Sequence, residues 1–200
     1  MEMSGEQLIP ASQQETWDAL NDPEVLKACV PGCEAIDLIA GNEYQVQMVA
    51  RVGPVSAKFK GRLTLSDIKP PSSYSIAFEG QGGPAGFAKG AAQVKLAPSG
   101  DHQTKLSYDV KANVGGKLAQ IGSRLIDAAA KKVADDFFAN FTKRMAQAED
   151  ETVVMQAPHD PGHGLPPGAA PMPTISNTTL MFFAAGSLVV FIVALVALFG

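Results

Sequence analysis

The feature that most constrains this chain is a hydrophobic period of two, which lasts from about residue 44 to about residue 113. Successive side chains of a strand point to opposite faces, so this alternation separates an apolar face from a polar one. The turn sequences "GPV", "KPPSS" and "APSGD" interrupt it. Short strands joined by tight turns, each with one solvated face, predict an antiparallel sheet in hairpin succession.

The apolar face of this sheet supplies most of the candidate ligand-binding residues. Lys58, Lys60 and Arg62 alternate onto the opposite face, which is typical of a solvated surface; the alternative is a docking surface for an acidic partner. The sheet residues that the period assigns to the inner, candidate lining are Val46, Met48, Phe59, Leu63, Ile76, Phe78, Gly90, Val94, Leu106, Tyr108 and Val110.

A long amphipathic helix is predicted from about Lys117 to Gln147, where apolar residues recur at intervals of three or four. An amphipathic helix and a sheet with a continuous apolar face must cover each other, which predicts an α+β fold with the sheet wrapped on the helix. The predicted stripe consists of Leu118, Ile121, Leu125, Ala129, Val133, Phe137, Phe141 and Met145. Its first five members complete the candidate lining.

Two short helices are predicted before the sheet. "SQQE", from Ser12 to Glu15, has the pattern of a capping box and opens the first of them. Asn21 or Asp22 caps the second, and Pro23 occupies its first position. The preceding stretch, "MEMSGEQLIP", indicates a short strand that ends at Pro10.

Small residues raise the question of a cavity between sheet and helix. Gly61, Gly90, Ala57, Ala88 and Ala92 lie on the predicted inner face, opposite a helix segment that contains three consecutive alanines, residues 128–130. Such residues leave room for a ligand, but a solidly packed core is the usual arrangement in proteins. Both alternatives remain open at this point.

The side-chain chemistry gives little indication of catalysis. Cys29 and Cys33 are interpreted as structural cysteines, because a metal site would need two further ligands. An enzyme would need polar groups in the interior, and the inner face offers mainly Tyr44, Tyr74 and Tyr108. All 16 Lys and Arg fall within residues 1–148, where 16 Asp and Glu match them. This neutral balance argues against a nucleic-acid partner.

The C-terminal part of the sequence has a different character. Leu180 to Gly200 is an uncharged apolar run of 21 residues, and a helix of that length rises about 31 Å, close to the thickness of a bilayer core. The N-terminus lacks the pattern of a secretory signal. We therefore predict a domain at 1–148, a Pro/Gly-rich disordered linker at 149–176 and a transmembrane tail anchor at 177–200. This single-pass C-terminal anchor would hold the domain at the cytoplasmic face of the cell membrane.

The order of the predicted elements resembles a known fold. A strand, two short helices, a meander of strands and one long helix resemble the helix-grip fold of the START and Bet v 1-like superfamily. The segment "W-x-x-L-N-D-P-E-x-L-x-x-C-V-P-G-C", from Trp17 to Cys33, more narrowly resembles the CoxG family, named for an accessory component of carbon monoxide dehydrogenase. The resemblance covers roughly residues 3–148.

This resemblance implies a non-catalytic domain that holds a lipophilic ligand and has no covalent cofactor. The expected partners are the membrane and a molybdenum-containing carbon monoxide dehydrogenase complex or a related hydroxylase. The expected ligand is respiratory quinone, menaquinone or ubiquinone, carried between membrane and enzyme for electron transfer. The alternative is a ligand-free adaptor that recruits the dehydrogenase to the membrane or aids its assembly.

Overall fold

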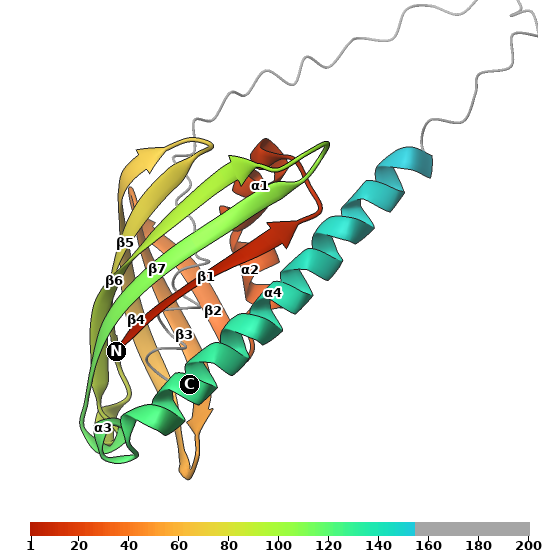
Figure 1. The fold of residues 1–200 in the computed structure, drawn as a ribbon. Helices are drawn as coiled ribbons and strands as arrows, with labels where there is room; N and C mark the ends of the chain where they lie inside the picture. The colour runs from red at the N-terminus through yellow and green to blue at the C-terminus, as the bar shows by residue number, and fades with distance from the viewer. Residues whose placement is uncertain (155–200) are drawn as a thin grey trace, which may run out of the picture.

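The computed structural model describes residues 1–154, which form one seven-stranded antiparallel sheet with helices on its concave side (Figure 1). The strand order is β1-β7-β6-β5-β4-β3-β2, so strands that follow one another from β2 to β7 are also neighbours in space. The predicted hairpin succession is confirmed. The strands are β1 (Glu2–Ile9), β2 (Cys33–Ala40), β3 (Glu43–Val52), β4 (Val55–Lys69), β5 (Ser73–Gln81), β6 (Phe87–Pro98) and β7 (Thr104–Gly115).

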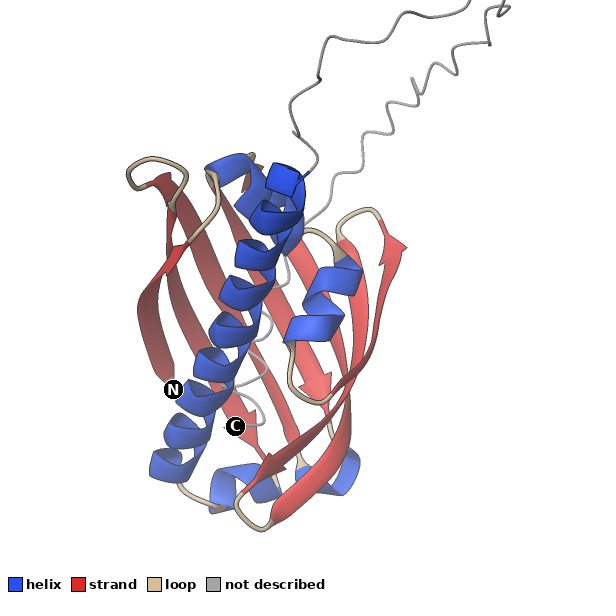
Figure 2. Ribbon diagram, turned by 90° about the vertical axis from the view of Figure 1, so that its right-hand side faces the viewer, coloured by secondary structure: helices blue, strands red, loops and turns tan. Residues whose placement is uncertain are grey.

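The helices lie on one side of the sheet, and the longest runs across its concave face (Figure 2). This helix packs mainly against α2, β1 and β3, so it spans the curved sheet from one edge strand toward the other side. The arrangement is the α+β helix-grip architecture that the sequence predicts. The helical elements are α1 (Gln13–Leu20), α2 (Pro23–Cys29), the 3₁₀ turn η1 (Gly83–Ala85), α3 (Lys117–Gln120) and α4 (Ser123–Val154).

The N-terminal signals of α1 and α2 act as predicted. The Glu15 backbone N–H donates to Ser12 Oγ at 3.3 Å, and the Ser12 N–H donates to the Glu15 carboxylate at 2.9 Å. At α2, the carboxylate of Asp22 accepts from the Glu24 N–H at 2.8 Å, and Pro23 is the first helical residue. These bonds satisfy amide donors that the first turn of a helix otherwise leaves without partners.

The single long helix predicted over residues 117–147 is in fact two helices. Gly122 separates α3 from α4 with a φ of +97°, a conformation that non-glycine residues rarely adopt. A continuous helix cannot pass through such a residue. The end of α4 also differs, because the helix continues to Val154, past the predicted domain boundary at residue 148.

The buried face of α4 differs from the predicted stripe in its first half. Steps of four residues advance about 40° around a helix, so a stripe built from fours drifts off one face. The observed face mixes steps of three and four, and it shares Phe137, Phe141 and Met145 with the predicted one. Its other buried members are Ile126, Ala130, Ala134 and Phe138.

The predicted C-terminal regions fall almost entirely outside the described residues. Residues 149–154, expected to begin the linker, belong to α4, and the linker from 155 onward and the span at 177–200 are not described. Within residues 1–154, no helix is long and apolar enough to cross a bilayer.

Candidate functional site: an apolar layer between sheet and helices

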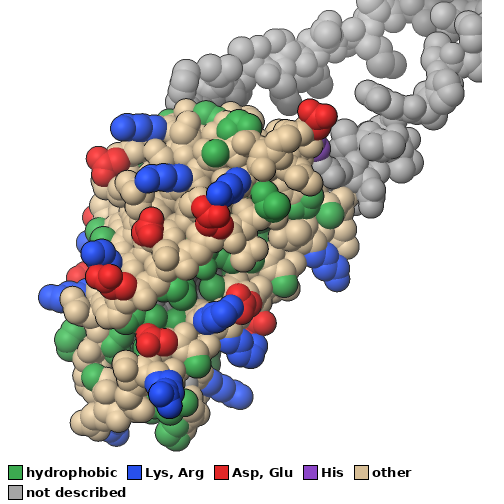
Figure 3. All heavy atoms as spheres, viewed as in Figure 1, with side chains coloured by type: hydrophobic (Ala, Val, Ile, Leu, Met, Phe, Trp, Pro, Cys, Tyr) green, Lys and Arg blue, Asp and Glu red, His purple; other side chains and the backbone are tan. Residues whose placement is uncertain are grey.

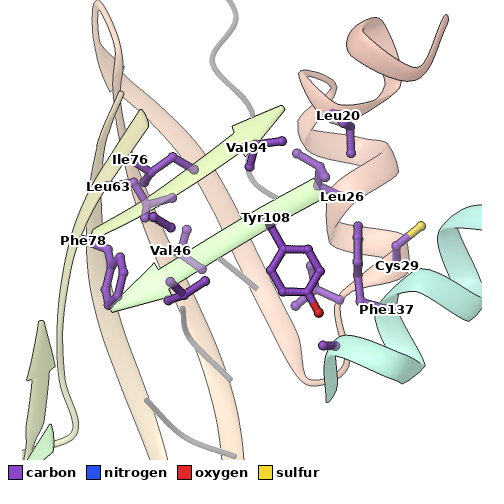
Figure 4. Close-up of a cluster of buried hydrophobic side chains, with 14 of the residues drawn as sticks. Leu20, Leu26, Cys29, Val46, Leu63, Ile76, Phe78, Val94, Tyr108 and Phe137 are labelled. Carbon is purple, nitrogen blue, oxygen red and sulfur yellow. The ribbon is translucent and has the colours of Figure 1, made fainter. Parts of the chain in front are cut away.

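The inner face of the sheet is an almost unbroken apolar surface. All the sheet residues predicted to line a site are buried, except Gly90, which is half-buried. Figure 4 shows Leu63, Ile76 and Phe78 projecting from the sheet into the layer that faces the helices. The period of two therefore placed the sheet side of this layer correctly, because alternation leaves no choice of face once one face is buried.

The helix side of the layer needs one correction. Leu125, predicted to line the site, is 51% exposed and lies outside the buried layer. Leu118 is buried, whereas Ile121, Ala129 and Val133 are half-buried at the margin of the core. Leu125 is exposed because the buried face of α4 passes through the next residue, Ile126.

The short helices supply residues that the sequence analysis did not assign to the site. Trp17, Leu20, Leu26 and Cys29 are buried, and Figure 4 shows the last three on the helical side of the same apolar cluster. Their spacing within α1 and α2 could have identified them, since each helix buries one face.

Aromatic rings join the layers. Tyr108 of β7 stacks on Phe138 of α4 with ring centroids 5.5 Å apart, and Phe138 contacts Phe137 edge-on at 5.1 Å. On the other helices, Trp17 meets Tyr74 of β5 edge-on at 5.5 Å. Such pairs fix helix positions more specifically than aliphatic contacts do, because ring geometry is directional.

Polar groups in this interior are few and gather near α1. The Thr104 hydroxyl donates to the Ala11 carbonyl at 2.9 Å, and the Asn21 amide donates to the Trp17 carbonyl. Thr16 Oγ1 and Asn21 Oδ1 have no hydrogen-bond partner among the described residues. Thr16, Asn21 and Thr104 are the buried polar residues of the described part, and no charged side chain is buried there. A molecule held in this layer would meet mainly hydrocarbon.

The three inner tyrosines are buried, and their chemistry at neutral pH is that of hydroxyl donors. Burial raises the pKa of Tyr108, and the nearby Asp135 carboxylate raises it further. The phenol therefore stays protonated at neutral pH and cannot act as a general base. Tyr44 and Tyr74 are buried and engaged in interactions of their own.

Gly90 does not provide the open room that its small size suggested. A Cβ atom on Gly90 would lie 2.1 Å from the Lys111 carbonyl oxygen and 2.5 Å from the Phe78 ring. Aromatic rings from neighbouring strands or segments cover other glycines in the same way. The pairs are Gly5 with Tyr108, Gly82 with Phe59, and Gly115 with Phe87.

The two cysteines are free and protonated. Burial raises the pKa of Cys33 to about 11 and also raises that of Cys29. Thiolate is the form that attacks electrophiles and binds metals, so both side chains are unreactive at neutral pH. Among residues 1–154, no three His, Cys, Asp or Glu side chains come together as a metal site would require.

A polar hollow of about 550 Å³ lies on the opposite, solvated face of the sheet, over β3, β4 and β5. Lys58 in this hollow pairs with Glu34 at 2.6 Å, and Arg62 pairs with Glu43 at 3.7 Å. Glu79 also lines it, directly across from Arg62. These acids offset the basic stripe, so the structure gives the hollow no strong preference for an acidic partner.

Comparison with solved structures shows the same fold elsewhere. A conserved protein from Geobacillus kaustophilus is 33% identical over 74% of this chain and 97% of its own, with a TM-score of 0.70. A START superfamily protein from Mycobacterium smegmatis has 14% identity and a TM-score of 0.59 over 74% of this chain and 98% of its own. The Zhui aromatase/cyclase from Streptomyces sp. R1128 has 11% identity and a TM-score of 0.55 over 74% and 95%. No curated protein matches the sequence.

The sequence itself matches one family model across the whole folded unit. The match runs from residue 5 to residue 146, from β1 into the second half of α4. It includes the Trp17–Cys33 segment, whose residues form the capped helices that close the apolar layer. The chain belongs to the carbon monoxide dehydrogenase CoxG family.

Proposed function

We propose that this protein binds a lipophilic molecule, respiratory quinone, between its sheet and α4, and carries it between the membrane and a carbon monoxide dehydrogenase. The observation that carries the proposal is the chemistry of the layer, which is apolar across strands from β3 to β7 and holds no charged side chain in the described part. Membership of the CoxG family supplies the dehydrogenase as the partner.

The apolar layer suits a quinone better than a water-soluble ligand. Quinones combine a small polar ring with a long isoprenoid chain, and transfer of apolar surface from water is worth about 25 cal/mol per Å². A chain of several isoprene units would gain several kcal/mol gross, of which binding to the protein loses part to immobilisation. The buried tyrosine hydroxyls are the polar groups available for the ring.

A membrane anchor completes the proposed route. The uncharged run from Leu180 to Gly200 has the length of a bilayer span, and the preceding 155–176 segment is rich in proline and glycine. Such a chain would hold the domain near its lipophilic cargo at the cytoplasmic face. The soluble enzyme would then receive or return quinone without entering the bilayer.

The competing function is an adaptor that recruits the dehydrogenase and carries no ligand. Gly90, which is covered by Phe78, favours the adaptor at that one position. A catalytic role like that of the structurally similar aromatase/cyclase requires acid–base groups, and the buried Tyr108 is held protonated. We therefore place the protein with carriers rather than enzymes.

The carrier is tested by its cargo and by one position on α4. Full-length protein purified from membranes is extracted, and its quinone content is measured by mass spectrometry. Ala130 is fully buried on the sheet-facing side, whereas Ala128 is exposed two residues earlier. We expect Ala130→Phe to lower quinone content at least tenfold and Ala128→Phe to leave it unchanged.

Melting temperature separates the two functions. In a solid layer, Ala130→Phe overpacks the core and costs about 1–3 kcal/mol or more. In a carrier, the new ring occupies ligand space and costs the unliganded protein little. A destabilised variant, together with a wild-type protein that never contains a lipophile, would leave the adaptor standing.

A further inference from the structure

The two ends of the fold carry different side chains, and the difference points to a partner. We call residues 51–55, 83–89 and 113–127 the α3 end. We call residues 10–24, 37–43, 66–72 and 98–104 the α1 end. The β6–β7 ladder runs from Phe87 with Gly115 at the α3 end to Pro98 with Thr104 at the α1 end. Twelve residues of strand separate the ends by roughly 36 Å.

The segments of the α3 end meet in space. A Cβ on Gly116 would lie 2.5 Å from the Gly86 Cα, so the start of α3 touches the η1 segment. A Cβ on Gly53, in the β3–β4 turn, would lie 3.9 Å from the Ile121 side chain. Figure 1 shows α3, the start of α4 and this turn together at the lower end of the molecule. They form one continuous surface.

Two large apolar side chains project from this surface. Phe87 is 47% exposed at the start of β6, and Leu125 is 51% exposed in the first turn of α4. An apolar residue exposed alone is ordinary, but two at one end, beside the half-buried Ile121, form an apolar tip.

Basic residues surround this tip. The α3 end has four basic side chains and one acidic one, and none of the four basic groups has an ion pair with a described residue. Figure 3 shows hydrophobic and basic side chains side by side at the lower end of the molecule. The charged residues of this end are Arg51, Lys89, Lys117, Arg124 and Asp127.

The α1 end has the opposite charge. It contains eight acidic side chains and one lysine, so an anionic surface would repel it. Apolar residues are exposed there too, namely Leu8, Leu38 and Ile39, but no comparable basic group accompanies them. Its acidic residues are Glu15, Asp18, Asp22, Glu24, Asp37, Glu43, Asp67 and Asp101.

We propose that the α3 end contacts the surface of an anionic lipid bilayer, with Phe87 and Leu125 inserted among the acyl chains and Lys117 and Arg124 on the headgroups. Apolar tips surrounded by cations suit such an interface, because insertion and charge attraction act together. This surface also includes α3, which closes the apolar layer with the buried side chain of Leu118. The proposal rests on the proposed function for its purpose, since a lipophile could then pass directly between layer and bilayer.

The tether permits this orientation. α4 carries the chain from the α3 end to the α1 end, about 48 Å for 32 residues, and the remaining sequence starts there. The segment from residue 155 to 179 contains about 25 residues, which can extend to roughly 80 Å. The domain can therefore turn its α3 end toward the bilayer in which its own tail would be anchored.

Hydrogen–deuterium exchange of the full-length protein tests the proposal. The protein is mixed with vesicles of phosphatidylcholine, with and without phosphatidylglycerol, and exchange is followed in peptides from both ends. We expect slower exchange over residues 83–89 and 117–126 with the anionic vesicles only. Equal exchange in both vesicles, or protection at the α1 end instead, would overturn the proposal.

Matched variants assign the effect to charge and to insertion. Each basic residue near an anionic surface strengthens binding about fivefold, so Lys117→Gln with Arg124→Gln should raise the lipid concentration for half-protection roughly 25-fold. The control is Lys69→Gln with Lys95→Gln, which changes net charge equally at the other end and should leave protection unchanged. Leu125→Ser should also weaken protection, whereas Leu8→Ser, also exposed but at the α1 end, should not.

Other occupants would give other outcomes. Protection that grows with protein concentration in the absence of lipid would assign the surface to a second copy, and protection only by added dehydrogenase would assign it to that enzyme; either contradicts the proposal. Quinone content of the same samples keeps the two proposals separate. A quinone-loaded protein without lipid protection refutes the bilayer contact alone, and lipid protection of a protein that never holds quinone refutes the carrier alone.

Discussion

The α1 end and the α3 end are both closed by short helices, but the helices are held in different ways. α1 and α2 have side-chain caps at their first turns, and they bury Trp17, Leu20 and Leu26. The Asn140 amide also donates to the Cys29 carbonyl at 3.1 Å, which ties α2 to α4. This end is part of the cooperative core.

The α3 end is held by much less. α3 has four residues, no side-chain cap, and glycines with positive φ on both sides, Gly116 and Gly122. Leu118 is its one fully buried side chain. The comparison teaches that helices covering the same apolar layer differ in opening free energy, because buried area and satisfied amides set that energy.

The largest expected effect is at the capped end. Trp17→Ala removes a buried ring and its edge-on contact with Tyr74, so we expect unfolding free energy to fall by about 3–5 kcal/mol. Urea unfolding followed by circular dichroism measures it. A loss under 1 kcal/mol would mean that α1 is not part of the cooperative core.

Leu118→Ala should cost less, about 2 kcal/mol, because the loss cannot exceed the free energy that docks α3. The accompanying sign is local: amide exchange should accelerate over residues 116–126 while α1 and α2 keep their protection. Ala119→Ser, at an exposed neighbour, is the control. If exchange accelerates equally in α1, the two ends open together and the contrast between them fails.

Gly122→Ala sharpens the comparison through the backbone. No atom lies within 4 Å of the added methyl, so the cost is the positive φ alone, about 1–2 kcal/mol. Thermal unfolding measures it, with Gly41→Ala, another open glycine with positive φ but at the α1 end, for comparison. An unchanged melting temperature would show that the α3–α4 junction readily adopts another conformation.

The smallest effect is expected from the capping box. Ser12→Ala removes the acceptor of the Glu15 amide and should cost about 1 kcal/mol, whereas Ser12→Asp should restore most of it. The same urea experiment detects the change. A neutral Ser12→Ala would mean that packing of Trp17 and Leu20 alone holds α1.

The sequence by itself determined the strands, their faces and the caps. Alternation decided the inner face from Val46 to Val110, because a shift of one residue would expose every apolar side chain. The capping signals at Ser12 and Asp22 are local, so their outcome does not depend on the rest of the fold. The family resemblance carried by residues 17–33 was also readable, since the motif is contiguous.

Only the tertiary structure decided the rotation of α4, the space beside Gly90 and the character of the two ends. Leu125 and Ile126 are equally apolar, and only contact with the sheet selects Ile126 as the buried one. Gly90 is small in the sequence, yet Phe78 from the neighbouring strand covers it. Lys117 and Arg124 join Phe87 at one surface because the curved sheet and α4 bring distant segments together. Period and composition describe each segment alone, and they contain no information about which segments meet.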